Sequence, residues 1–257
     1  MTPDAMQWVA VAVVAIGVVL VLTQRTPVQP VVTESVPPEK PVTVLVVSAS
    51  DMHGGYADQN GQLQRYNPTP VEMMAQATPD LVWIDRSVNG MKATEALAGG
   101  AVASAVPGTG EQTTTDSLAK LLDGSPEVRV LYWGCWLVDV LFAGMTPAQF
   151  VAMLDQVIDT AQARGVVPVM RGAHQFVCNG LMTGERLDRL AAFDHLLKAH
   201  CAARGVVVAD MRAVPFEGAG SVCGDGLHPT KDYHQALAMA GAEVVRAVAA
   251  GSVIEQR

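Results

Sequence analysis

Five short runs of β-branched and other apolar residues recur along the chain. They are Val42–Val47, Leu81–Asp85, Val128–Trp133, Val166–Met170 and Val206–Asp210. Six segments with the spacing of amphipathic helices lie between and after them: Pro70–Ala77, Met91–Ala98, Thr115–Leu122, Thr146–Arg164, Arg186–Arg204 and Thr230–Ala249. Apolar strands alternating with helices predict a parallel sheet covered on both faces. We therefore expect an α/β domain with a three-layer, doubly wound, five-stranded parallel sheet of the flavodoxin-like kind. The Gly-, Ala- and Thr-rich segment from Gly99 to Thr114 is expected to be a surface loop.

The N-terminal segment differs from the rest of the chain. The run Ala5–Leu22 contains no charged residue, and its length suits a transmembrane helix or the apolar core of an export signal. Asp4 precedes it and no small-residue cleavage site follows it, which favours an uncleaved anchor. We expect three parts: an anchor or signal segment at 1–25, a Pro- and Val-rich linker at 26–41, and a folded α/β domain at 42–257.

The orientation of this anchor is weakly specified. Arg25 after the apolar run and Asp4 before it favour a cytoplasmic C-terminal side. The linker favours the opposite arrangement, because an extended spacer holds a domain away from a membrane surface. We expect a single-pass protein bound to the membrane through residues 5–22, with its folded domain outside the cytoplasm.

Composition excludes several functions. The net charge of −8 and the 5% of aromatic residues argue against a nucleic-acid partner. The four cysteines show no C-x-x-C pair and no zinc-like spacing with histidine, so we expect no metal and no cofactor. Cys178 and Cys223 both lie in glycine-containing loop segments, and we predict that they pair as a disulfide in an oxidising compartment.

The hexapeptide Asp225-Gly226-Leu227-His228-Pro229-Thr230 carries the clearest chemical signal. Asp225 precedes His228 by three residues, so its carboxylate can hold one ring nitrogen while the other faces a nucleophile. The alternative is a simple turn that begins the last helix, since Asp, Gly and Pro are common in such turns.

A candidate nucleophile follows the first strand. Val42–Val47 runs directly into Ser48-Ala49-Ser50-Asp51, where a parallel α/β sheet places its active site. Both serines could also be ordinary loop or capping residues. A serine at this edge, together with Asp225 and His228 before the last helix, favours a catalytic triad.

With these motifs the sequence resembles the SGNH or GDSL-type hydrolases over roughly Pro41 to Ala249. The resemblance implies that Ser50 is the nucleophile and that Asp225 and His228 form the fourth conserved block. It also implies that Gly90 belongs to the second block and donates its backbone N–H to the oxyanion, with the N–H of Ser50 as a second donor.

Two blocks depart from the family pattern. The third block, Gly-x-Asn-Asp, is replaced by Gly134-Cys135-Trp136-Leu137, so the asparagine that donates to the oxyanion is absent. We expect Trp136 to line an acyl or sugar pocket; alternatively its indole N–H donates to the oxyanion. Removing one such donor typically slows turnover by roughly 10²–10³. The first block has Ser48 and Ala49 in place of Gly and Asp, and Asp51 is a candidate substitute for that carboxylate.

The remaining histidines are weaker candidates. His53 and His174 are expected in loops, where both could rim the cleft. His195, His200 and His234 lie in helical segments and are expected to be exposed.

The sequence therefore predicts a membrane-tethered serine esterase. Its substrate would be a small-molecule or carbohydrate carboxylic ester carrying a short acyl or O-acetyl group. Two alternatives remain: an acyltransferase to a sugar hydroxyl, and a non-catalytic binding or structural module with a degenerate site.

Overall fold

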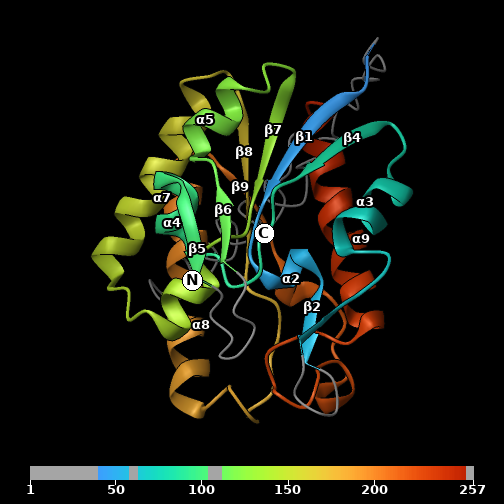
Figure 1. The fold of residues 1–257 in the computed structure, drawn as a ribbon, viewed down its shortest axis with the longest axis vertical. Helices are drawn as coiled ribbons and strands as arrows, with labels where there is room; N and C mark the ends of the chain where they lie inside the picture. The colour runs from blue at the N-terminus through green and yellow to red at the C-terminus, as the bar shows by residue number, and fades with distance from the viewer. Residues whose placement is uncertain (1–39, 58–62, 104–111, 253–257) are drawn as a thin grey trace, which may run out of the picture. The chain divides into compact units, whose positions relative to one another are not determined.

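The computed structural model describes residues 40–57, 63–103 and 112–252 of the chain. These residues contain a five-stranded sheet with helices on both faces (Figure 1). Its strands are β1 (Val42–Val47), β4 (Leu81–Asp85), β7 (Val128–Trp133), β8 (Val167–Arg171) and β9 (Val207–Ala209). Neighbouring strands are parallel in the order β4-β1-β7-β8-β9. This is the flavodoxin-like order, so the predicted five-stranded, doubly wound sheet is confirmed.

The helices divide between the two faces of the sheet. Those described are α2 (Ser50–His53), α3 (Pro70–Ala77), α4 (Ala93–Ala98), α5 (Leu118–Asp123), α6 (Leu137–Phe142), α7 (Pro147–Gln162), α8 (Gly184–Ala203) and α9 (Lys231–Ala249). Short 3-10 turns lie at Met211–Ala213 and Gly218–Gly220. One core joins the sheet to α3 and α9, and the other joins it to α4, α5, α6, α7 and α8 (Figure 1).

β1 is buried on both faces at the middle of the sheet. Val44 and Val46 belong to the core under α3 and α9, whereas Leu45 and Val47 belong to the opposite core. Each of these side chains is at most 1% exposed. The alternation explains why the strand reads as a continuous apolar run. Because both cores anchor the strand, they also fix the position at which the chain leaves the sheet after Val47.

Two helices begin with the same local signal. The Thr69 hydroxyl accepts a hydrogen bond from the backbone N–H of Glu72, and the Glu72 carboxylate accepts one from the backbone N–H of Thr69. This reciprocal pair caps the start of α3. Thr146 and Gln149 form the equivalent pair at the start of α7. Each helix then opens with proline, whose fixed φ suits the first helical position. These signals are local, so they are readable from the sequence.

The structure also contains elements that the apolar pattern does not predict. β2 (Gly55–Ala57) pairs antiparallel with β3 (Leu63–Arg65), and β5 (Gly100–Ala103) pairs antiparallel with β6 (Gln112–Thr115). The expectation of a loop from Gly99 to Thr114 is therefore wrong at both of its ends. Strands of three or four residues are too short to show a periodic pattern. The apolar pattern also does not reveal α6, because its side chains are mostly buried and the helix therefore lacks an amphipathic period.

The predicted membrane anchor, Ala5–Leu22, and most of the linker, residues 26–39, fall outside the described residues. Among the residues that are described, no helix has the length and apolar character needed to cross a bilayer.

Candidate active site

Ser50 opens a short helix immediately beyond the central strand. β1 ends at Val47, and the buried Ser48 and Ala49 carry the chain out of the sheet into α2. The strand order reverses between β1 and β7, which is where doubly wound sheets form a crevice at the carboxyl ends of their strands. The topology therefore presents the half-buried Ser50 at the edge that this fold uses for ligands.

Asp225 and His228 lie in the turn between β9 and α9. One carboxylate oxygen of Asp225 accepts the backbone N–H groups of Leu227 and His228 at 2.9 and 3.0 Å. Gly226 adopts a φ of 72°, and a Cβ there would lie 2.2 Å from the carbonyl oxygen of Asn179. Only glycine fits this turn, because both its backbone conformation and the neighbouring loop exclude a side chain. The turn thus orients the carboxylate towards the imidazole that follows it.

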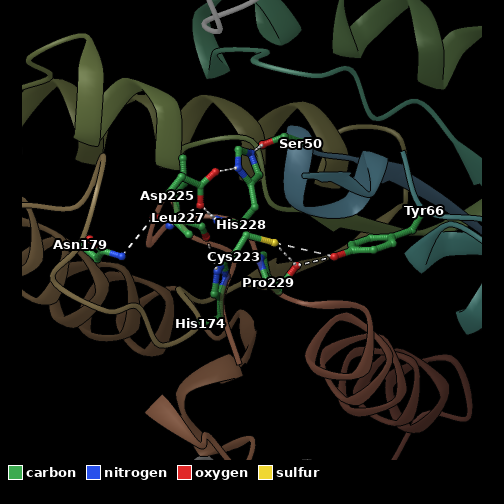
Figure 2. A network of polar contacts seen from close by, with 10 residues as sticks. Ser50, Tyr66, His174, Asn179, Cys223, Asp225, Leu227, His228 and Pro229 are labelled. Carbon is green, nitrogen blue, oxygen red and sulfur yellow. Dashed lines mark hydrogen bonds and ion pairs between the residues drawn. The ribbon is translucent and has the colours of Figure 1, made fainter. Parts of the chain in front are cut away.

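The three side chains form one continuous chain of hydrogen bonds (Figure 2). The Asp225 carboxylate lies 2.6 Å from Nδ1 of His228, and Nε2 of His228 lies 3.2 Å from Oγ of Ser50. A carboxylate can only accept from the ring, so Nδ1 carries the proton and Nε2 is free to accept from the serine hydroxyl. The structure therefore brings Ser50, His228 and Asp225 together in the geometry of a nucleophile, a base and an orienting group.

The environment keeps Asp225 ionised. Burial raises the pKa of its carboxyl group, but hydrogen bonds from His228 and Leu227 and the interaction with the imidazole outweigh that effect, so the net pKa lies below its usual value. The carboxylate is consequently charged at neutral pH. A charged orienting group stabilises the imidazolium that forms when His228 takes a proton.

Neighbouring segments hold the His228 turn in place. The Tyr66 hydroxyl donates to the Pro229 carbonyl at 3.2 Å, and the Asn179 amide donates to the Gly224 carbonyl at 3.1 Å (Figure 2). Burial raises the pKa of the Tyr66 phenol, so it remains a donor at physiological pH. The role of Tyr66 in holding this turn cannot be recognised from the sequence, because no local motif links it to a turn more than 150 residues later.

Asn89 and Gly90 belong to the segment that follows β4. The N–H of Val88 donates to the Ser48 carbonyl at 3.1 Å, which draws the segment after β4 against the start of α2. A Cβ on Gly55 would lie 3.4 Å from both Asn89 Oδ1 and Ser50 Cβ, so both side chains border Gly55. Gly90 is buried and has a φ of 69°. In the described part of the chain, its N–H makes no backbone hydrogen bond.

Trp136 lies in the core instead of the substrate pocket. Its side chain is 1% exposed, and its ring packs edge-on against Phe150 with centroids 5.4 Å apart. Its indole N–H donates to the carbonyl of Arg171 at 2.9 Å. The position differs from both roles expected from the sequence, because the N–H is already used and the residue does not line the pocket beside Ser50. A buried indole whose N–H has a backbone partner is well suited to a core.

A small apolar pocket adjoins Ser50 and His228. Its free volume is 30 Å³, which is room for about two water molecules. Phe142 lies at the exposed end of α6, with the Arg186 guanidinium 4.7 Å from its ring centroid. The apolar side chains that form the pocket come from α6 and from the His228 turn: Leu137, Val138, Leu141, Phe142, Leu227 and Pro229.

A buried polar cluster lies next to Ser50. The Arg171 guanidinium pairs with the Asp51 carboxylate at 2.5 Å, and Ser48 Oγ donates to the same carboxylate at 3.0 Å. His174 and His234 are also buried, each only 1% exposed. The expectation that His234 is exposed is therefore wrong, because the face of α9 that carries it packs on the sheet.

The other predicted features have mixed outcomes. His174 lines the pocket, and His53 Nδ1 lies 3.3 Å from the Ser87 carbonyl. His195 is exposed as expected, whereas His200 is half-buried and contacts Asp155 at 2.9 Å.

The predicted disulfide is absent, since all four cysteines are free thiols. Instead, the N–H of Cys223 donates to the His228 carbonyl at 2.7 Å. Within the ranges that the structure describes, no group of three or more His, Cys, Asp or Glu side chains is placed to hold a metal ion.

The two buried histidines predict a loss of stability in acid. Burial and the charge of Arg171 hold the pKa of His174 well below its usual value and lower that of His234 to about 3. Below pH 6.5 the unfolded state therefore binds more protons than the folded state. As the pH is lowered through this range, the free energy of unfolding should decrease by up to about 1.4 kcal/mol per pH unit for each histidine.

His234→Phe should make this fall shallower, because phenylalanine keeps an aromatic ring in the core and cannot be protonated. Denaturant unfolding between pH 7.5 and 5 measures the slope, with the exposed His195→Phe as the matched control. Equal slopes in the wild type and both variants would exclude this assignment.

The fold is shared with known enzymes, although no family model and no curated protein matches the sequence. Est24, a carbohydrate acetylesterase from Sinorhizobium meliloti, is 14% identical with a TM-score of 0.63, covering 80% of this chain and 99% of its own. An aryl esterase from M. smegmatis is 14% identical with a TM-score of 0.60, covering 80% and 99%. A GDSL-like lipase from Bacteroides thetaiotaomicron is 9% identical with a TM-score of 0.56, covering 80% and 88%. The described domain thus has the fold of the SGNH or GDSL-type hydrolases.

Proposed function

We propose that this protein is a serine hydrolase that cleaves carboxylic esters with short acyl groups. The observation that carries the proposal is the unbroken hydrogen-bonded chain from Ser50 through His228 to Asp225. Its members come from two turns that lie 178 residues apart in sequence. A binding module has no need to keep a nucleophile, a base and an orienting carboxylate in register, so the geometry favours an enzyme over the non-catalytic alternative.

The reaction follows from the positions of these groups. Ser50 Oγ attacks the acyl carbon while His228 Nε2 takes its proton, and Asp225 stabilises the imidazolium. The N–H groups of Ser50 and Gly90 bind the oxyanion of the tetrahedral intermediate. Collapse breaks the ester bond, and His228 returns the proton to the departing alcohol. Water then attacks the acyl-enzyme with His228 again as base, which releases the acid and restores the Ser50 hydroxyl.

The pocket supports a short acyl group as the substrate's acid component. Its walls are apolar and its free volume of 30 Å³ suits a methyl or ethyl group beside the acyl carbon. The name of one structural neighbour, a carbohydrate acetylesterase, is consistent with an O-acetyl group on a sugar. We therefore propose a small-molecule or carbohydrate ester as substrate, with the alcohol component directed away from this pocket.

We also propose that the domain is tethered to a membrane and lies outside the cytoplasm. The support is the uncharged apolar run Ala5–Leu22, followed by a Pro- and Val-rich spacer. Such a run costs little to place in hydrocarbon, whereas the described domain contains many surface charges.

The triad assignment predicts the effects of two substitutions. Ser50→Ala should abolish both hydrolysis of p-nitrophenyl acetate and labelling by a fluorophosphonate. Asp225→Asn should lower turnover by about 10⁴, because the amide no longer fixes the reactive tautomer of His228. Steady-state kinetics and mapping of the labelled peptide test both effects.

A matched control is Ser117→Ala, which changes a half-buried helix-capping serine outside the site and should keep full turnover. Label on Ser48, or turnover that survives Ser50→Ala, would contradict the assignment.

The pocket predicts a limit on acyl length. The wild type should hydrolyse p-nitrophenyl acetate far better than the hexanoate, because the pocket has no room for a longer chain. Phe142→Ala should open its outer end and shift the hexanoate-to-acetate ratio of kcat/KM by about tenfold or more. Leu181→Ala removes a similarly exposed apolar side chain outside the pocket and should leave the ratio unchanged. A ratio that is insensitive to Phe142→Ala would place the acyl group elsewhere.

The tether predicts the behaviour of the full-length chain. Because a spanning helix is not displaced by high pH, alkaline carbonate should leave the protein in the membrane fraction. Added protease should degrade the domain when the outer side of the membrane is exposed. Release by carbonate would exclude the anchor, and protection of the domain in intact cells with a permeable envelope would place it in the cytoplasm.

A further inference from the structure

The helix that carries Ser50 cannot hold its own position. α2 has four residues, and its N-cap residue, Ala49, provides no side-chain hydrogen bond. Isolated helices shorter than about 12–15 residues are marginal in water, so a single turn depends on its tertiary contacts. Two side chains of α2, Asp51 and Met52, are buried and anchor it to the domain. Met52 makes nondirectional apolar contacts in the core, whereas Asp51 accepts a hydrogen bond from Ser48 and pairs with Arg171.

Asp51 is held on both of its oxygens. Oδ1 accepts from Ser48 Oγ at 3.0 Å, and Oδ2 lies 2.5 Å from Nη1 of Arg171. The side chains of Asp51 and Arg171 are only 6% and 2% exposed. Bulk water therefore does little to screen this ion pair.

Arg171 is itself fixed by the sheet. It is the last residue of β8, and its carbonyl accepts the indole N–H of Trp136 at 2.9 Å. Gly134 leaves the space that the cluster needs, because a Cβ there would lie 2.5 Å from Ser48 Oγ and 3.3 Å from Arg171 Cδ. The guanidinium thus projects from a rigid strand to the residue that follows the nucleophile.

Stability alone is a weak reason for such a pair. Removing two charges from water is expensive, and well-packed apolar residues of similar volume often stabilise a protein as well. The other groups around Arg171 do not balance its charge: His174, His234 and Tyr132 are all neutral at pH 7, given the lowered pKa values of the histidines and the raised pKa of the tyrosine. Asp51 supplies the compensating negative charge.

We propose that the Asp51–Arg171 ion pair is a positioning device for the nucleophile. It fixes α2 to the end of β8 so that Ser50 Oγ stays within hydrogen-bonding distance of His228 Nε2. The inference rests on the proposed function, in which this contact transfers the proton. His228 belongs to a separate turn, so any shift of α2 changes the distance directly, and a displacement of about 1 Å can lower turnover by roughly 10².

The central test is Asp51→Asn in the full-length protein, which keeps the size of the side chain and removes its charge. Turnover of p-nitrophenyl acetate should fall by roughly 10- to 10²-fold per folded molecule, with KM nearly unchanged. The matched control is Asp155→Asn, which removes an ion-pairing carboxylate between α7 and α8. A pair that served only stability would lower the unfolding temperature and leave kcat unchanged, as the control should.

A double-mutant cycle tests whether the two residues act as one unit. Arg171→Met and Asp51→Asn should each lower kcat, and the double variant should lose no more than the worse single variant. Arg171→Lys should retain more turnover than Arg171→Met, because it keeps the charge. If Asp51→Asn does not fold, Ser48→Ala removes one contact of the same carboxylate, and a reduced kcat at unchanged KM is then expected. Additive losses in the cycle, or full turnover in these variants, would overturn the proposal.

A crystal structure of Asp51→Asn provides a readout that does not depend on turnover. The distance from Ser50 Oγ to His228 Nε2 should exceed 3.5 Å, compared with 3.2 Å in the wild type. An unchanged distance would overturn the positioning role even for an active enzyme. A wild type that neither turns over esters nor reacts with a fluorophosphonate would instead refute the proposed function, and the measured distance would still decide the positioning role.

Discussion

The hydrogen bond between Ser50 and His228 requires two turns that lie far apart in the sequence to meet at one edge of the sheet. Parallel pairing satisfies this requirement, because every strand ends at the same edge. β1 supplies the first turn from the middle of the sheet, and the segment after β9 supplies the second before α9. Burial of β1 on both faces fixes the first turn, and the backbone bonds to Asp225 fix the second.

Two carboxylates at this edge of the sheet each pair with a nitrogen-bearing side chain. Asp225 is half-buried and pairs with the His228 imidazole, whereas Arg171 is fully buried and pairs with Asp51, the residue after Ser50. The charge of Arg171 also acts on His174 and His234 and helps to keep both neutral. The imidazole that contacts the Ser50 hydroxyl also has a carboxylate beside it that stabilises its charged form.

The parallel sheet and the Asp225–His228 turn could be predicted from sequence because both depend on local signals. Apolar strands alternate with helices, and Asp225 and His228 share one hexapeptide. The positions of Tyr66, Arg171 and His234 could not be predicted, since each depends on contacts between distant elements. His234 shows the limit clearly: helical periodicity places it on α9, but only the packing of that helix on the sheet determines that it is buried.

The departures from the family pattern in the first and third blocks are physically connected. The first block lacks the usual carboxylate, and Asp51 supplies one directly after Ser50. The third block has Trp136 in place of an amide donor, and its indole N–H binds the Arg171 carbonyl. Arg171 in turn pairs with Asp51. Trp136, Arg171 and Asp51 therefore form one line of contacts from the third block to the residue after Ser50, so the residue that replaces the amide donor also helps to hold the helix that carries Ser50.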